Sequence, residues 1–234
     1  MAIISWDEGH GTGDDVGADG FVNEEKVIRE YAPIVIAELE RHGHTCINCT
    51  PPSNTSMTVN QSLAYRTLHS NNSGSILHLC FHVNAYDDVS AHGAEIEYAS
   101  STGAKYATSV LTEICKLGFT NRGIKNPRLW MTYQLSAVSI LIEPFFCTNS
   151  NDCNLYNKTT LGLAIAKGIL NIIGGTITVS PVVKPVAFST VNYCLQFQKW
   201  FNLITQTSDK LIEDGFYGVK TQAKYDAMGT YIKK

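Results

Sequence analysis

Short apolar runs alternate with segments of helical periodicity through residues 1–174, and this alternation constrains the fold more than any other feature of the sequence. The pattern predicts strands at residues 2–6, 45–49, 76–83, 94–98, 128–131 and 139–145, and helices at residues 24–41, 59–70, 104–117 and 152–173. Such alternation is typical of an α/β fold. We therefore expect a mostly parallel sheet with helices on both of its faces.

The pattern changes after the last of these helices. Gly174 and Gly175 end it, and the following residues are rich in threonine and valine, with prolines at Pro181 and Pro185. This composition predicts an extended linker at residues 176–186. The chain therefore divides into a domain at residues 1–175, the linker, and a small α-helical C-terminal domain at residues 187–234.

Composition and charge narrow the class of protein. The 234 residues are 44% hydrophobic and 17% charged, which is typical of a globular chain rather than a disordered or fibrous one. Residues 1–174 carry 11 basic and 17 acidic side chains, so they offer no basic field for nucleic acid. No run approaches the roughly 18 apolar residues of a membrane helix. The N-terminus has no basic segment before its short apolar run, so we expect neither membrane insertion nor a secretory signal peptide.

Two histidines and two glutamates fall where an α/β sheet places its functional groups, outside the carboxyl ends of the strands. His10 follows the first expected strand in a glycine-rich loop, and His82 ends the third. Glu24 begins the first helix and can return to the same edge. Two imidazoles and a carboxylate would form a three-ligand zinc site with one open position. Glu143 lies within an apolar strand, where a charge is costly unless it is paired or functional.

Each of these residues also has an ordinary structural interpretation. A histidine near a strand end is often a hydrogen-bonded structural residue. Glu24 fits a first-turn carboxylate that the helix dipole favours. Glu143 fits a salt bridge to an arginine such as Arg66. Residue types and spacing alone leave both interpretations open, because they do not fix whether these distant side chains meet.

Longer stretches around these residues occur along the chain in the same order as the motifs of a known family. They are Gly9-His10-Gly11, residues 17–24, Arg41-His42-Gly43-His44, Leu63-x-x-Arg66, Phe81-His82-Val83-Asn84-Ala85, and Ile140-Leu141-Ile142-Glu143 with Phe145-Phe146. Together they resemble the zinc-dependent N-acetylmuramoyl-L-alanine amidases of the clostridial phage endolysin type, over most of residues 1–174. Residues Asp7-Glu8-Gly9 depart from the family's usual Asp-Pro-Gly, which bears on substrate preference more than on metal binding.

The resemblance implies a role for each residue. His10, Glu24 and His82 are then the ligands of a Zn²⁺ cofactor, and Glu143 is the catalytic carboxylate. Glu24 is preferred over the adjacent Glu25 because of its spacing from the later Gly-His pair. The remaining histidines match no ligand position: His42, His44, His69, His78 and His92. Among them His78, on the strand of His82, is interpreted as a buried core residue rather than a supporting neighbour of the metal.

The C-terminal domain has a resemblance of its own. The patterns Cys194-x-x-Phe197-Gln198-x-x-Phe201-Asn202 and Asp214-Gly215-x-Tyr217-Gly218 are similar to the small helical peptidoglycan-binding module. Residues 175–234 carry 7 basic and 4 acidic side chains, which suits anionic wall polymers. The alternative is a small docking or oligomerisation segment, because aromatic core packing explains the same residues.

The resemblances imply a phage endolysin that lyses its host. It would hydrolyse the peptidoglycan amide between N-acetylmuramic acid and L-alanine with zinc-activated water, and would stay in the host bacterial cytoplasm until lysis. Its partners would be bacterial peptidoglycan and associated wall polymers, not nucleic acid. Two alternatives remain: a zinc peptidase that cuts within the stem peptide, and a wall-binding protein without activity.

Overall fold

The structure of this chain is a computed structural model that describes residues 1–53 and 55–174. The predicted linker at residues 176–186 and the predicted helical domain at residues 187–234 lie outside the described residues, so that division of the chain stays a prediction. None of the helices in the described part is long and apolar enough to span a membrane.

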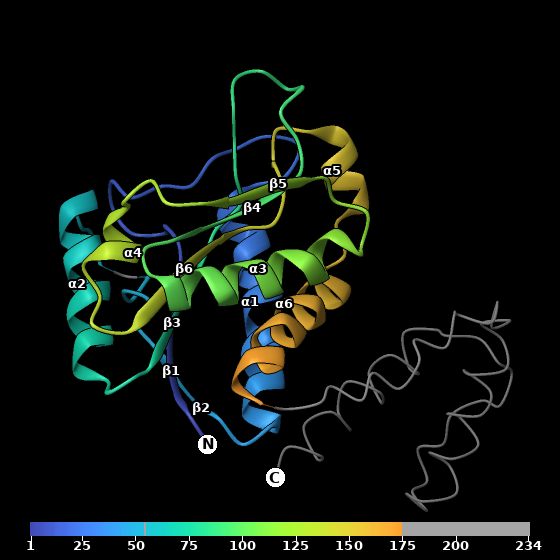
Figure 1. The fold of residues 1–234 in the computed structure, drawn as a ribbon. Helices are drawn as coiled ribbons and strands as arrows, with labels where there is room; N and C mark the ends of the chain where they lie inside the picture. Colours follow the sequence, from blue (N-terminus) through green and yellow to red (C-terminus); the bar gives the residue numbers. More distant parts are fainter. Residues whose placement is uncertain (54, 175–234) are drawn as a thin grey trace, which may run out of the picture. The chain divides into compact units, whose positions relative to one another are not determined.

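Six strands and the helices between them make up the described fold (Figure 1). The strands are β1 (Ile3–Glu8), β2 (Thr45–Asn48), β3 (Leu77–Phe81), β4 (Ala94–Tyr98), β5 (Asn121–Lys125) and β6 (Val138–Glu143). The helices are α1 (Glu24–Arg41), α2 (Val59–Asn72), α3 (Ser101–Cys115), α4 (Trp130–Tyr133), α5 (Ser150–Leu155) and α6 (Lys158–Ile173).

The strands form one sheet in the order β2-β1-β3-β6-β4-β5. Each neighbouring pair is parallel except β4 and β6, which are antiparallel. The predicted α/β fold with a mostly parallel sheet is therefore confirmed. Because β1, β3 and β6 run in the same direction, their carboxyl ends lie at one edge of the sheet, where an α/β fold places its functional groups.

One face of the sheet is covered by the apolar helices α1, α3 and α6. Strand side chains alternate between faces, and Ile4, Leu79 and Ile142 point into this core, each fully buried. The helices pack closely there: a Cβ atom on Gly168 of α6 would lie 2.5 Å from the Cα atom of Val110 in α3. This face contains the large hydrophobic cluster of the described chain.

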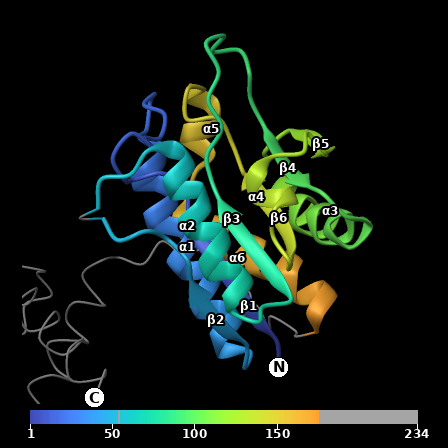
Figure 2. The same cartoon turned by 90° about the vertical axis from the view of Figure 1, so that its left-hand side faces the viewer.

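The other face is covered by α2 and α4, which face the viewer in Figure 2. Here most of the buried strand residues are polar. Ser5 Oγ lies 2.8 Å from Ser70 Oγ of α2, and Asp7 pairs with Arg66 of the same helix. The apolar contacts on this side are limited to a small cluster that includes Cys80, Met131 and Leu141.

The sequence prediction misplaced one strand and missed another. Residues 128–131 are not a strand: Arg128 has a φ of 56°, in the left-handed region, and Trp130 and Met131 lie in the single turn of α4. The Met131 carbonyl there accepts a hydrogen bond from the Ser139 hydroxyl (2.6 Å). The missing strand is β5, whose residues Asn121–Lys125 are too polar for an apolar pattern because they form an outer edge of the sheet.

The predicted helix at residues 152–173 is two helices, α5 and α6. Tyr156 is extended between them, and the Asn157 side chain caps α6 by accepting hydrogen bonds from the backbone N–H groups of Thr159 and Thr160. The helix predicted at residues 24–41 is α1, which runs unbroken through Pro33.

Candidate active site

The structure brings His10, Glu24 and His82 together at the carboxyl edge of the sheet. His10 follows β1, His82 follows β3, and Glu24 is the first residue of α1. The possible ligand atoms of these three side chains all lie within 4.8 Å of one another. His10 Nε2 is 3.3 Å from Glu24 Oε1, and His82 Nδ1 is 3.2 Å from the same oxygen. Such a group of side chains can hold a metal ion.

The backbone and the imidazole of His10 are both fixed. Its φ of 61° lies in the left-handed region, which is rare outside glycine. Its Nδ1 atom lies 2.8 Å from Asp15 Oδ1, so the carboxylate orients the ring with Nε2 toward Glu24. Burial by itself lowers the pKa of His10, but hydrogen bonds to Asp15 and Glu24 outweigh it and raise this pKa to about 9. In this protonated form both nitrogens donate to carboxylates.

Glu24 is placed by the start of α1. The Asn23 side chain caps this helix by accepting a hydrogen bond from the N–H group of Lys26. The Glu24 carboxylate in turn accepts hydrogen bonds from the backbone N–H groups of Ala18 (2.8 Å) and Val83 (3.1 Å). Burial opposes its charge, but hydrogen bonds to His10 and His82 hold the pKa of Glu24 well below its usual range. Glu25 instead accepts from Gly17 N–H and is outside the three-residue group.

His82 is fixed through its backbone by a neighbouring strand and by a helix. Its N–H group donates to the carbonyl of Ile142 in β6 (3.1 Å), and its carbonyl accepts from the Tyr31 hydroxyl of α1 (2.8 Å). The rings of His10 and His82 meet edge to face, with centroids 4.7 Å apart. The fold therefore sets the approach of the two imidazoles before any ligand is bound.

Glu143 ends β6, the strand next to β3, and so lies at the same edge as His82. It does not pair with Arg66, so the salt bridge considered from the sequence is absent from the described residues. Its Oε2 atom is buried without a hydrogen-bond partner in the described part of the chain. Burial, followed by the negative charges of Glu97 and Glu24, raises the pKa of Glu143 well above its usual range.

Two further carboxylates share the face of Glu143. In the antiparallel pair of β4 and β6, Glu95 lies opposite Glu143, and Glu97 lies two residues further along β4. Glu95 is neutralised by Arg122 and Lys125. Glu97 Oε2 is buried without a partner in the described chain. Burial and then the charge of Glu95 raise the pKa of Glu97 to about 7. The sequence analysis did not single out either residue.

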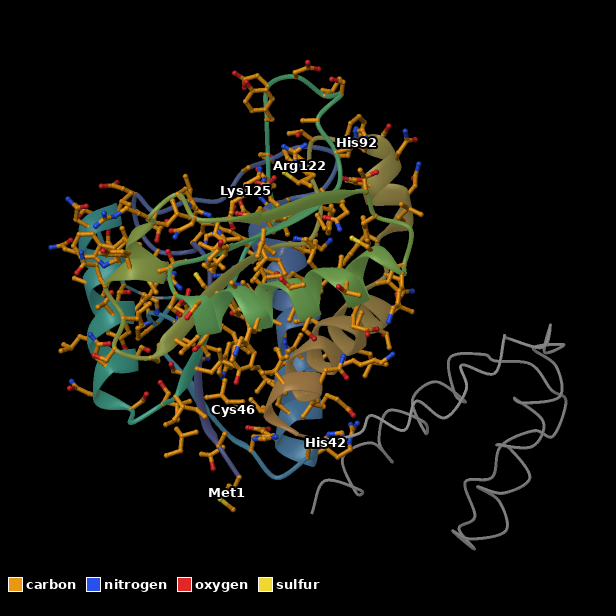
Figure 3. The ribbon with its side chains drawn as sticks, viewed as in Figure 1. Met1, His42, Cys46, His92, Arg122 and Lys125 are labelled. Atoms are coloured by element: carbon orange, nitrogen blue, oxygen red, sulfur yellow. The ribbon has the colours of Figure 1, made fainter. Side chains whose placement is uncertain are left out.

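The remaining histidines lie outside this group. Figure 3 shows His42 at the opposite end of the sheet from Arg122 and Lys125, consistent with its place after the last turn of α1. His78 is fully buried, as predicted, and its Nε2 atom lies 2.7 Å from Asp7 Oδ2.

Asp7, His78 and Cys80 form a second group whose atoms are close enough to hold a metal ion. In that group, however, Asp7 Oδ1 already accepts a hydrogen bond from Arg66 Nη1 (2.5 Å). The guanidinium is 2% exposed and supplies the positive charge that this carboxylate needs. We therefore interpret this second group as a buried ion-pair cluster.

Solved structures with this architecture are amidase catalytic domains. The catalytic domain of the CD27L endolysin, which targets Clostridia difficile, is 28% identical, with a TM-score of 0.69 over 73% of this chain and 98% of that one. The amidase AmiC2 of Nostoc punctiforme is 26% identical, with a TM-score of 0.64 over 74% of this chain and 97% of that one. The catalytic domain of the amidase CwlV from Paenibacillus polymyxa, 21% identical with a TM-score of 0.65, shares the fold.

Comparison of sequences shows the family to which this chain belongs. The family model for N-acetylmuramoyl-L-alanine amidase (Amidase_3) matches residues 4–174, and the chain belongs to this family. A curated relative, an uncharacterised protein of Clostridium perfringens, is 28% identical over 162 residues. The match covers 65% of this chain and 47% of that protein, so the chain spans about half the length of this relative.

Proposed function

We propose that this chain is an endolysin: a zinc-dependent amidase that hydrolyses the peptidoglycan amide between N-acetylmuramic acid and L-alanine. The observation that carries the proposal is the convergence of His10, Glu24 and His82 at the edge of the sheet where β6 ends in Glu143, whose buried Oε2 atom has no hydrogen-bond partner among the described residues. Family membership and the similarity to an endolysin catalytic domain support the substrate and the reaction.

The three proposed ligands fit zinc. Zinc in catalytic sites binds neutral imidazole nitrogen and carboxylate oxygen, with three protein ligands and one open position. Two ligands that each lie ~2.0–2.1 Å from a tetrahedral ion are about 3.4 Å apart. The two imidazole nitrogens lie 3.3 and 3.2 Å from Glu24 Oε1. His10 and His82 would both bind as neutral rings, so binding would release a proton from His10.

In the proposed reaction, zinc bound by these residues supplies the Lewis acid that makes water nucleophilic near neutral pH. Glu143 takes a proton from the attacking water as that oxygen bonds to the lactyl carbonyl carbon. The carbon–nitrogen bond then breaks, and Glu143 returns the proton to the leaving nitrogen. The products are a lactyl carboxylate on the sugar and a free L-alanine amino group. The raised pKa of Glu143 suits the proton-donating step.

The test is mass spectrometry of purified peptidoglycan digested by the full chain. The proposal expects intact glycan strands and new stem peptides that begin with L-alanine. Glu143→Gln, purified in the same way, is the matched control for contaminating hydrolases. Cleavage within the stem peptide would identify a peptidase instead. Binding to walls without any product would identify a wall-binding protein without activity.

The biological role belongs to the same proposal. We expect the protein to stay in the host bacterial cytoplasm until lysis, and residues 187–234 to bind the cell wall. The sequence resemblance of that segment and its 7 basic against 4 acidic side chains over residues 175–234 support wall binding. A fluorescent protein fused to residues 176–234 should label susceptible cells, and less so as salt is added. If the fusion labels no wall and its removal breaks an oligomer, the segment is an assembly element.

A further inference from the structure

A buried arginine on the polar face of the sheet is connected to the proposed ligand His10 by several hydrogen bonds. Arg66 lies in α2, not at the edge of the sheet, and only 2% of it is exposed. Its Nη2 atom donates to the His10 carbonyl (3.0 Å), and its Nη1 atom donates to the Glu8 carbonyl. The guanidinium therefore bridges the last residue of β1 and the residue whose imidazole enters the site.

These hydrogen bonds stabilise an unusual backbone conformation of His10. His10 has a φ of 61°, and a left-handed conformation is sterically unfavourable for a residue other than glycine. Arg66 satisfies the His10 carbonyl in this conformation, and Arg29 Nη2 donates to the same oxygen (3.2 Å). Gly11 follows, with backbone N–H donating to the Asp15 carbonyl (2.9 Å). The turn that points the imidazole at Glu24 thus depends on contacts from two helices.

A second path joins Arg66 to the imidazole itself. Arg66 Nε donates to Ser62 Oγ (3.2 Å), and the Ser62 hydroxyl donates to Asp15 Oδ2 (2.6 Å). The other oxygen of Asp15 lies 2.8 Å from His10 Nδ1. A carboxylate on Nδ1 fixes which nitrogen carries the proton when the ring is neutral, and so leaves the Nε2 lone pair available to a metal.

The positive charge of Arg66 is balanced by the buried carboxylate of Asp7 in β1. Its Nη1 atom donates to Asp7 Oδ1 (2.5 Å), and Asp7 Oδ2 lies 2.7 Å from His78 Nε2. Asp7 and His78 are both fully buried. A fork of several donors is the property that distinguishes arginine from lysine, whose single ammonium cannot reach all of these acceptors at once.

We propose that Arg66 is a positioning residue for the metal ligand His10, which it acts on through the His10 carbonyl and through Ser62 and Asp15. The inference rests on the proposed function, because it requires His10 to bind the metal. According to this inference, the buried polar cluster under α2 holds His10 in its binding geometry before the metal binds.

The experiment measures zinc affinity of the metal-free full chain by competition with a chromogenic chelator. Ser62→Ala removes the hydrogen-bonded link to Asp15 without changing any charge, and leaves the longer ion pair of Arg66 Nη2 with Asp15 Oδ2 (3.9 Å) in place. Arg66→Lys keeps the charge but loses the fork. We expect zinc affinity to fall about 10-fold for Ser62→Ala and between roughly 10- and 100-fold for Arg66→Lys, the usual effect of losing such support. The visible absorption of the cobalt(II)-substituted chain should shift in both variants, because it reports ligand geometry.

Matched controls separate positioning from general stability. Ser109→Ala removes another helix serine, whose hydroxyl donates to the Gly168 carbonyl, and Arg122→Lys changes another arginine paired with a glutamate. Both should keep the wild-type zinc affinity and cobalt spectrum. Thermal unfolding of each metal-free variant gives its stability separately. If Arg66→Lys does not fold, Ser62→Ala decides the question.

Two results contradict different claims. Wild-type zinc affinity and an unchanged cobalt spectrum in Ser62→Ala and in folded Arg66→Lys would overturn the inference alone and leave Arg66 a structural ion pair. A wild-type chain that binds no zinc, or a His10→Ala variant that binds it normally, would contradict the proposed function and the inference with it.

Discussion

The two faces of the sheet bury very different groups. On one face, residues such as Ile4, Leu79 and Ile165 are fully buried in a single apolar cluster with α1, α3 and α6. On the other, Asp7, Arg66 and other charged groups are buried under α2 and α4. Apolar burial contributes about 25 cal/mol per Å², whereas a buried ion pair contributes roughly nothing beyond a hydrophobic replacement. The comparison teaches that the apolar face supplies most of the stability, whereas the buried charges of the polar face help to position residues of the site, together with Glu24 and Tyr31 of α1.

Loss of the metal ligands should have the largest effect. His82→Ala removes an imidazole that the fold already holds beside Glu24, and should leave no zinc bound and no amide cleavage above background. Treating the wild-type chain with a chelator should do the same, and added zinc should restore activity. The measurement is release of L-alanine amino groups from purified walls, with zinc content determined in parallel. Full activity in demonstrably metal-free enzyme would rule out the proposed site.

Replacing the proposed base should come next. Glu143→Gln keeps the size of the side chain and removes the group that moves the proton, so the rate should fall by on the order of 10²–10⁴-fold. Zinc affinity should stay close to wild type, because Glu143 is not among the three clustered ligands. Thermal unfolding should occur at no lower temperature than in the wild type, because burial already disfavours the charged form of Glu143. Normal turnover by this variant would show that another group moves the proton.

A substitution on the apolar face should lower stability and leave turnover unchanged, the opposite of a substitution at the proposed site. Ile165 of α6 is fully buried, and Ile165→Ala should lower the free energy of unfolding by about 2–5 kcal/mol. Turnover per folded molecule should not change. Ile172→Ala is the control, since this residue is 42% exposed and should change stability by less than ~0.5 kcal/mol. A large loss of turnover in folded Ile165→Ala would break the division between the faces.

The smallest expected effect is a pH dependence on the polar face. The pKa of Glu97 is raised to about 7 in the folded chain, from 4.5. A raised carboxyl pKa means that folding favours the protonated form, so its stabilisation is complete below about pH 4.5 and is lost as the pH rises through about 7. Glu97→Gln removes this dependence and should gain on the order of 1–3 kcal/mol relative to wild type between pH 5 and pH 8.

The measurement for Glu97 is denaturant unfolding of both proteins across that pH range without metal. The pair of Glu113 and Lys116 offers a control, since Glu113→Gln removes a carboxylate whose pKa is lowered and should shift stability in the opposite direction. An unchanged difference between wild type and Glu97→Gln from pH 5 to pH 8 would show that Glu97 stays charged throughout.

Much of the apolar face could be predicted from the sequence, and less of the polar face. Hydrophobic periodicity locates α1 and β3 because burial of apolar side chains is a local pattern. It misses β5, whose polar residues sit at the sheet edge, and it misplaces a strand at residues 128–131. It cannot locate Asn157 as the cap that divides the last predicted helix, because Asn is common in loops and caps alike.

The candidate site likewise contains residues that could be predicted from the sequence and residues that could not. His10, Glu24 and His82 were predicted through the family resemblance, and the structure places them together. Their assigned roles remain proposals. The supporting residues Arg66 and Asp15 were not predicted as a unit, because their contacts join residues that are 47 or more positions apart. The only local indication was an acid five residues after His10, and spacing alone does not distinguish it from Asp14.

The position of β6 in the sheet has a consequence for how this chain folds during synthesis. It is the last strand of the described chain in sequence order, yet it lies between β3 and β4. A growing chain that has not reached residue 138 can pair β1 with β3, but it leaves β3 and β4 with open edges that invite pairing with other chains. The same late strand ends in Glu143, so the ribosome must complete nearly the whole domain before the proposed proton carrier exists.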